Sequence, residues 1–164
     1  RLFLNLNISI FARQTIKMLP KKTKYAIKAL MTLAKSYEKH EPMRIVDIAQ
    51  QDNIPKKFLE AILLDLRKIG VVNSKMGAHG GYYLSKHPEE IYLSNIIRYT
   101  GGPLAMVSCV SLNFYEKCEE CTSEENCGLR DVMKDVRDAT LQILSKTSLA
   151  ELMRREENLE NANQ

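Results

Sequence analysis

Residues 45–70, IVDIAQQDNIPKKFLEAILLDLRKIG, contain two segments of helical periodicity separated by a short polar break. The apolar residues that share one face of the first segment, or pack just beyond it, are Ile45, Ile48, Ala49 and Ile54. The second segment has a longer apolar stripe, formed by Phe58, Leu59, Ile62, Leu63, Leu66 and Ile69. Pro55 suits the first turn of this second helix, and Gly70 suits its C-terminal cap. A short helix, a turn of about four residues and a longer helix predict a helix-turn-helix.

A further helix is expected before this unit and a β-hairpin after it. Helical periodicity runs from Thr23 to about His40. After the helix-turn-helix, β-prone runs at 71–72 and 82–84 are separated by a flexible tip. The glycines of this tip are Gly77, Gly80 and Gly81. A hairpin that directly follows a helix-turn-helix predicts a winged helix, with the hairpin as the wing.

The net charge of +4 conceals a strong asymmetry along the chain. Residues 18–87 contain 13 Lys or Arg against 6 Asp or Glu, whereas residues 88–164 contain 8 against 14. This distribution suggests that only the front half meets a polyanion such as nucleic acid, although solvated basic faces are also common. Lys56 and Lys57 lie in the first turn of the second helix, where they oppose the helix dipole at a small cost that phosphate contacts would offset.

The wing carries further candidate contacts with DNA. Lys75 and His79 could donate hydrogen bonds to phosphate or to the minor groove, and Gly77 and Gly80 would allow a close approach of the backbone. Taken by itself, His79 is more often a surface turn residue. A glycine-rich loop that cradles a nucleotide phosphate requires a helix after the loop, and here a strand follows, so nucleotide binding is disfavoured.

The acidic half is expected to contain a short helix, a cysteine-rich loop and a long helix. Leu93, Ile96 and Ile97 mark the short helix, which the sequence TGGP ends. The apolar stripe of the long helix consists of Leu129, Val132, Met133, Val136, Ala139, Thr140, Ile143 and Leu144. Packing against the same helix of a second copy would bury this stripe in a two-fold dimer, and folding back on its own domain is the alternative. The charged tail after Leu149 is expected to be frayed.

All four cysteines lie in one glutamate-rich stretch, as Cys109, Cys118, Cys121 and Cys127. Disulfides are disfavoured because the expected compartment is the reducing cytoplasm. The acidic neighbours raise the cost of forming a thiolate, so the cysteines are poor nucleophiles unless a metal cation removes their protons. Four thiolates could hold a tetrahedral zinc ion or an iron–sulfur cluster, and the spacing by itself slightly favours zinc.

The segment MLPKKTKYAIKALMTLA at 18–34, the segment 45–97 and the cysteine cluster together resemble the winged-helix regulators of the Rrf-two family, which includes IscR, NsrR and CymR. The match runs from Met18 to about Thr147. It rests on a basic first helix, a helix-turn-helix, a glycine-rich wing, a short helix, a cysteine loop and a long helix in this order. The resemblance implies a mainly α fold with a small β wing, and a homodimeric, sequence-specific DNA-binding transcriptional regulator, in most relatives a repressor.

The resemblance also assigns contacts with double-stranded DNA, whose operator would be an inverted repeat with half-sites about 34 Å apart. Major-groove contacts would come from residues 55–58, with Glu60 near the base edges. Phosphate contacts beside the first helix would come from Lys21, Lys22 and Lys24. Many relatives have an Arg before the wing glycine, where this chain has Met76 before Gly77. Either Lys75 takes over that contact or this wing reads the minor groove more weakly.

For the cysteines, the resemblance shifts the expectation from zinc to an iron–sulfur cluster of the 2Fe–2S or 4Fe–4S type. The ligands in the matching loop are Cys118, Cys121 and Cys127. One relative supplies the fourth ligand as a His where this chain has Arg130, and another as an Asp from the first helix where this chain has Lys24. Cys109 is therefore expected as the fourth ligand, although a small buried apolar role is equally open to it. Zinc and a cofactor-free loop remain alternatives.

The expected organisation has five parts. Residues 1–17 are expected to be upstream translated sequence outside the fold, because their apolar run is interrupted and no small-residue cleavage site follows. The parts that follow are a DNA-binding domain at 18–100, a cysteine loop at 101–128, a dimerisation helix at 129–147 and a flexible tail at 148–164.

Other classes of function fit the sequence less well. No run of apolar residues is long enough for a membrane span. An enzyme would need a nucleophile with a base, or paired acids in a pocket, and the sequence suggests neither these nor a small-molecule substrate. The remaining rival is a thiol-based regulator of the same fold without iron. The favoured hypothesis is a switch in which loss or oxidation of the cluster, through iron shortage, nitric oxide or oxygen, changes DNA binding.

Overall fold

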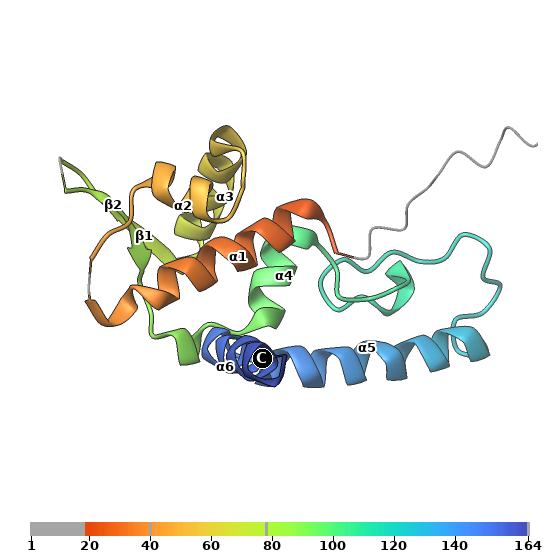
Figure 1. Ribbon diagram of the computed structural model, residues 1–164. Helices are drawn as coiled ribbons and strands as arrows, with labels where there is room; N and C mark the ends of the chain where they lie inside the picture. The colour runs from red at the N-terminus through yellow and green to blue at the C-terminus, as the bar shows by residue number, and fades with distance from the viewer. Residues whose placement is uncertain (1–18, 40, 78, 164) are drawn as a thin grey trace, which may run out of the picture.

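The computed structural model describes residues 19–39, 41–77 and 79–163, so the expectation for residues 1–17 lies outside the described residues. Over the described ranges the chain is mainly helical with one two-stranded antiparallel sheet, which confirms the predicted fold class (Figure 1). The α-helices are α1 (Lys21–Lys35), α2 (Ile45–Gln51), α3 (Lys56–Lys68), α4 (Leu93–Gly101), α5 (Gly128–Lys146) and α6 (Leu149–Ala162). The strands are β1 (Val72–Lys75) and β2 (Gly81–Leu84), and the short 3₁₀ helices are η1 (Tyr37–Lys39), η2 (Pro88–Glu90) and η3 (Ser108–Val110).

Helices α2 and α3 form the predicted helix-turn-helix, and β1 and β2 form the wing beside it. The turn between the helices contains Asn53, whose φ of 52° lies in the left-handed region that Asn tolerates better than most residues. Ile54 then returns into the core, and its N–H donates to the carbonyl of Ala49. In the wing, Val72 pairs with Leu84 and Lys75 pairs with Gly81.

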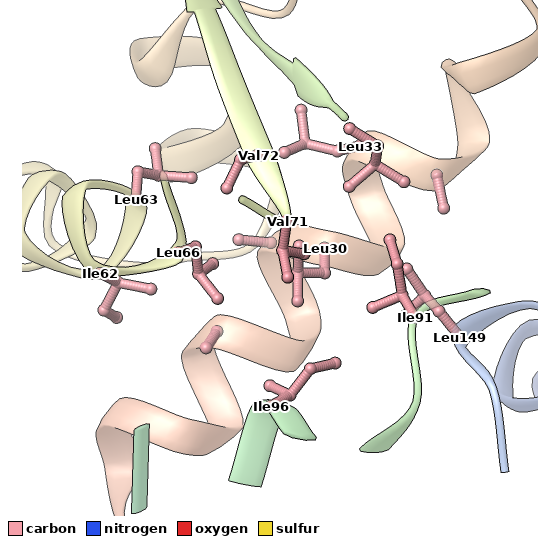
Figure 2. Packing of buried hydrophobic residues seen from close by; sticks show 14 of the residues in the cluster. Leu30, Leu33, Ile62, Leu63, Leu66, Val71, Val72, Ile91, Ile96 and Leu149 are labelled. Carbon is pink, nitrogen blue, oxygen red and sulfur yellow. The ribbon is translucent and has the colours of Figure 1, made fainter. Parts of the chain in front are cut away.

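The hydrophobic core lies where α1 meets α3, the wing, α4 and the start of α6. Leu30 and Leu33 of α1 lie beside Val71 and Val72, with Leu66 of α3 on one side (Figure 2). Each such side chain contributes roughly 1.5–3 kcal/mol when fully buried. The helix-turn-helix and the wing are thus fixed to one common support, α1.

The C-terminal segment differs from the flexible tail expected at 148–164. It forms α6, whose first residue, Leu149, is fully buried in the core. The N–H of Leu149 donates to the carbonyl of Ile91 at 2.8 Å, and the Ser148 hydroxyl caps the helix by accepting from the N–H of Glu151. The charged composition of the segment did not indicate this helix. One buried leucine and one capping serine are enough to fix its start.

Helix α5 packs against α4 and η3 on one side and is otherwise open to solvent. It runs on the side of α1 opposite to α2 and α3 (Figure 1), and none of its residues is buried. Leu129, Val132 and Ile143 are 65%, 55% and 63% exposed. Folding of the stripe back onto its own domain is therefore not observed, and only Leu144 among the predicted stripe residues packs against the core.

Two further expectations need correction. Phe58, predicted in the buried stripe of α3, is 40% exposed, because it lies in the first turn of the helix, beyond the edge of the core. Helix α1 ends at Lys35 rather than near His40, and η1 follows it. Among the described residues, no helix has the length and apolar character needed to cross a membrane.

Candidate nucleic-acid interface and cysteine site

The first turn of α3 is basic and open to solvent. Lys56, Lys57 and Glu60 are all exposed, and the wing projects beside the same end of the molecule (Figure 1). Pro55 precedes the helix and makes no side-chain cap, and the first turn contains no acidic residue. The positive end of the α3 dipole is therefore not compensated within the described chain, which favours an approaching anion such as phosphate.

The three lysines predicted to contact phosphate do not have the same surroundings. Lys21 and Lys24 are exposed on α1. Lys22 instead donates to a carboxylate oxygen of Asp65 on α3 at 2.7 Å, and Lys68 donates to the other oxygen at 3.1 Å. The hydrogen bonds from Lys22 and then Lys68 lower the pKa of Asp65 below its usual range. Lys22 therefore connects α1 to α3, a role that no sequence pattern indicated.

An aromatic pair, which sequence reasoning missed, lies next to these lysines. The rings of Tyr25 on α1 and Phe58 on α3 meet edge to face, with centroids 5.8 Å apart and planes at 80°. Such a pair adds about 0.5–1.5 kcal/mol beyond its buried area. It fixes the first turn of α3 against α1, so the exposed lysines of that turn are held on a rigid helix end.

The wing is held to α3 and has a glycine-rich tip. Arg67 of α3 donates to the Ser74 hydroxyl of β1 at 3.1 Å. Lys75 and His79, the wing residues expected to contact DNA, are exposed. A Cβ added at Gly80 would lie 2.3 Å from the carbonyl oxygen of Lys75, so only glycine fits there.

All four cysteines border one hollow of about 310 Å³, which is open to solvent. Cys118 is exposed and the other three are half-buried. The remaining residues around the hollow are Val107, Ser108, Glu124, Leu129 and Arg130. The chain thus brings Cys109, from η3, to the same place as the three cysteines of the loop and of the α5 N-terminus.

The thiols of this hollow interact with one another. Burial is the main cause that raises the pKa of the Cys121 thiol, and the proximity and hydrogen bond of Cys127 raise it further. The Cys121 thiol donates to the carbonyl of Ser123 at 3.2 Å. The Cys127 sulfur caps α5 by accepting from the N–H of Arg130 at 3.4 Å. The favoured state of Cys121 in the structure is therefore the neutral thiol.

Two arginines of α5 attach the segment around η3 to that helix. Arg130 donates to the carbonyl of Cys109 at 3.3 Å, and its guanidinium lies 3.8 Å from the Glu124 carboxylate. About two helical turns further along the same face, Arg137 donates to the carbonyl of Val110 at 2.6 Å. Arg130 stands where the resemblance placed a fourth ligand in one relative, and here it joins the walls of the hollow.

The donor set fits a soft metal centre in chemistry and in number. Four thiols around one hollow match the ligand requirement of zinc or of an iron–sulfur cluster. Within the described ranges, however, no three His, Cys, Asp or Glu side chains are grouped closely enough to form a metal site as they stand. The thiols would have to lose their protons and draw together on binding, as is usual when metal binding is coupled to local folding.

Comparison with known proteins covers most of the chain. The family model Rrf2, described as iron-dependent transcriptional regulator, matches residues 19–155. A candidate rrf2-like HTH-type transcriptional regulator of Rhodobacter capsulatus is 39% identical over 83% of this chain and 92% of its own. The HTH-type transcriptional regulator CymR of Bacillus subtilis is 31% identical over 80% of this chain and 86% of its own. IscR of Photorhabdus laumondii is 30% identical over 88% of this chain and 84% of its own.

Solved structures agree with these similarities. The structure of B. subtilis CymR, named the global cysteine regulator of that organism, matches with a TM-score of 0.67 and 30% identity. It covers 82% of this chain and 94% of that one. The structure of IscR from T. potens matches with a TM-score of 0.64 over 86% of this chain and 89% of that one, and at 24% identity it supports the fold only.

Proposed function

Because the chain belongs to the Rrf2 family of DNA-binding transcriptional regulators, we propose that it binds an inverted-repeat operator as a homodimer. In this proposal the first turn of α3 enters the major groove and the wing meets the minor groove. The thiols of Cys109, Cys118, Cys121 and Cys127 would hold an iron–sulfur cluster that controls this binding. The single observation that carries the sensing part is the convergence of all four cysteines on one hollow.

Three features support the DNA-binding face. Lys56 and Lys57 are exposed on the uncompensated N-terminal end of α3, and Lys21 and Lys24 are exposed on α1, which packs against α3. Glu60 lies on the same exposed part of α3, where it would accept hydrogen bonds from base edges. Because phosphate contacts release counterions, the logarithm of the affinity should fall linearly with the logarithm of the salt concentration, with a slope of about −0.9 for each contact.

The exposed stripe of α5 supports the homodimer. Leu129, Val132 and Ile143 are each more than half exposed, so the helix leaves a row of apolar side chains in water. The same helix of a second copy would cover the row in a symmetric contact. A dimer would present two α3 helices to successive major grooves.

The route from the cysteines to the DNA-binding face follows contacts within the chain. Arg130 and Arg137 attach the η3 segment to α5, and α5 packs against α4. Helices α4 and α6 both pack against α1, which supports α3. When bound, a cluster supplies a centre whose oxidation or loss changes the order of its ligands. A change in the conformation of the residues that line the hollow would thus alter the position of α5 relative to the helix-turn-helix.

Oxygen-free purification followed by an optical spectrum and iron, sulfide and zinc analysis tests the cofactor. We expect visible absorption that Cys121→Ala abolishes and that Thr122→Ala, an exposed neighbour without a thiol, retains. Removal of the cluster is expected to change the affinity for a duplex selected by the protein by about 5- to 150-fold, the usual range of allosteric coupling. A colourless protein free of iron would contradict the cluster, and bound zinc would support the zinc alternative.

A thiol regulator without metal is the second candidate, because Cys121 and Cys127 border the same hollow. In this case peroxide would oxidise the two thiols to a disulfide, with loss of two protons and two electrons, and would be reduced to two waters. Peptide mapping after peroxide treatment would then find a Cys121–Cys127 bridge in a protein that contains no iron. Cys118→Ala should not prevent this bridge, whereas it should weaken the cluster.

A further inference from the structure

We propose that Met76, at the tip of the wing, inserts into the minor groove as an apolar wedge. The wing would then select DNA by how easily a base step unstacks rather than by charge. This inference rests on the proposed DNA-binding face and assigns a specificity-determining role to a residue that the basic contacts leave out.

Met76 is 92% exposed, the highest value among the large apolar side chains of the described residues. It precedes Gly77 in the tip and follows Lys75, the last residue of β1. A single exposed apolar side chain is common on protein surfaces and carries no meaning by itself. What distinguishes Met76 is the way in which the chain holds it.

Backbone contacts hold the hairpin that carries Met76. The N–H of Gly80 donates to the carbonyl of Gly77 at 2.9 Å, and Gly77 has a φ of 109°. At Gly81 a Cβ would lie 2.3 Å from the carbonyl oxygen of Met43. Met43 and Tyr82 exchange two backbone hydrogen bonds of 2.9 and 2.8 Å, so the segment before α2 flanks the hairpin. This packing holds the strand that returns from the tip in place.

The wing is also held relative to the major-groove reader. The Arg67–Ser74 hydrogen bond of 3.1 Å joins α3 to β1, and the two elements pack against each other. Once α3 is seated in a major groove, Met76 therefore has a fixed position relative to the neighbouring groove. Lys75 beside it supplies the cation for the flanking phosphates.

Chemistry then decides what Met76 can do in a groove. A thioether side chain donates no hydrogen bond and carries no charge, so it cannot read base edges. Apolar side chains, methionine included, unstack base steps when they enter the minor groove, and pyrimidine–purine steps unstack most easily. We therefore expect a preference for TA or CA steps at the position that faces the wing.

The test uses the full chain and duplexes that the wild-type protein enriches from a random library. Met76→Ala should weaken binding about tenfold, the size expected for the loss of one buried apolar side chain, with an unchanged slope against salt. Met76→Leu should retain affinity, and Leu159→Ala, which removes another exposed apolar side chain from α6, should have no effect. Met76→Lys should steepen the salt slope by about 0.9 for each new phosphate contact.

A fluorescent 2-aminopurine base at the step that faces the wing reports unstacking directly. We expect the fluorescence to rise on binding of the wild-type protein and of Met76→Leu, but not of Met76→Ala or Met76→Lys. Equal affinity and equal fluorescence for wild type and Met76→Ala would overturn the wedge while leaving the DNA-binding face intact. Enrichment of no sequence by the wild-type protein would instead overturn the proposed function.

Discussion

The two halves of the molecule treat their apolar side chains in opposite ways. In the front half, Leu30, Leu63 and Leu66 are fully buried between α1 and α3. In the back half, α5 carries a stripe of similar residues and buries none of them. The core of the front half is therefore closed within one chain, with Ile96 of α4 and Leu149 of α6 completing it. The back half leaves the apolar stripe of α5 and the cysteine hollow open to solvent. In our proposal a second protomer covers the stripe, and a metal centre fills the hollow.

The largest expected effect is on the front half, through Leu30→Ala. This change removes a fully buried side chain at the centre of the core, so we expect the free energy of unfolding to fall by about 2–5 kcal/mol. Denaturation followed by circular dichroism measures it. Leu159→Ala, at an exposed position of α6, is the matched control and should change stability by less than about 0.5 kcal/mol. A similar loss of unfolding free energy in both variants would contradict the contrast between the buried core and the exposed helices.

The second prediction concerns the exposed stripe of α5. Ile143→Asp places a charge on each side of the proposed two-fold contact, so we expect the dimer to weaken by a factor on the order of 100 or more. Analytical ultracentrifugation measures the association, and circular dichroism should show that the fold persists, because Ile143 is 63% exposed in the single chain. Asp135→Asn, an exposed change on the same helix, is the control. An unchanged dimer would show that another surface holds the protomers together.

The same contrast explains what the sequence could predict. Periodicity identified α2, α3 and the long helix, because apolar residues recur at helical spacing whether a partner from the same chain or from another covers them. It misjudged Phe58, because a stripe does not reveal where the core ends. It also missed α6, where the charged composition outweighed the anchor at Leu149.

For the candidate site, the sequence located the cysteines and most of the exposed lysines, since these residues are recognised by type and spacing. It could not find the contacts of Asp65, Arg130 and Arg137, because each joins segments far apart in the chain. The last two predictions address these long-range contacts.

The third prediction is Arg137→Gln, which removes the charged hydrogen bond to the carbonyl of Val110. Its side chain is only 15% exposed, so the contact is screened less than one at the surface. We expect stability to fall by about 1 kcal/mol, and amide hydrogen exchange around η3 to rise more than in α1. Arg155→Gln, on exposed α6, is the control. Equal exchange at η3 in wild type and variant would show that Arg137 does not hold this segment to α5.

The smallest effect is expected for Asp65→Asn. Asp65 has a lowered pKa in the folded state, mainly through its hydrogen bond from Lys22, so its carboxylate stabilises the fold above the unfolded pKa of about 3.9. Since both partners of the pair are about one third exposed, at 36% and 35%, solvent screening should limit the loss at neutral pH to about 0.2–1 kcal/mol. The stability difference between wild type and variant should stay constant from pH 8 to 5 and shrink as the pH falls through the lowered pKa.

The same variant tests whether Lys22 serves only in the ion pair with Asp65 or can also contact DNA. With Asp65 neutral, Lys22 is free to reach a phosphate, and we expect the slope of log affinity against log salt to steepen by at most about 0.9 per subunit. Asp47→Asn, which releases Arg44 from a similar exposed pair, is the control for a general gain of positive charge. A steeper slope in Asp65→Asn alone would mean that the contact between α1 and α3 restrains a DNA-binding lysine. An unchanged slope together with a stability difference that widens in acid would contradict both the restraint and the lowered pKa.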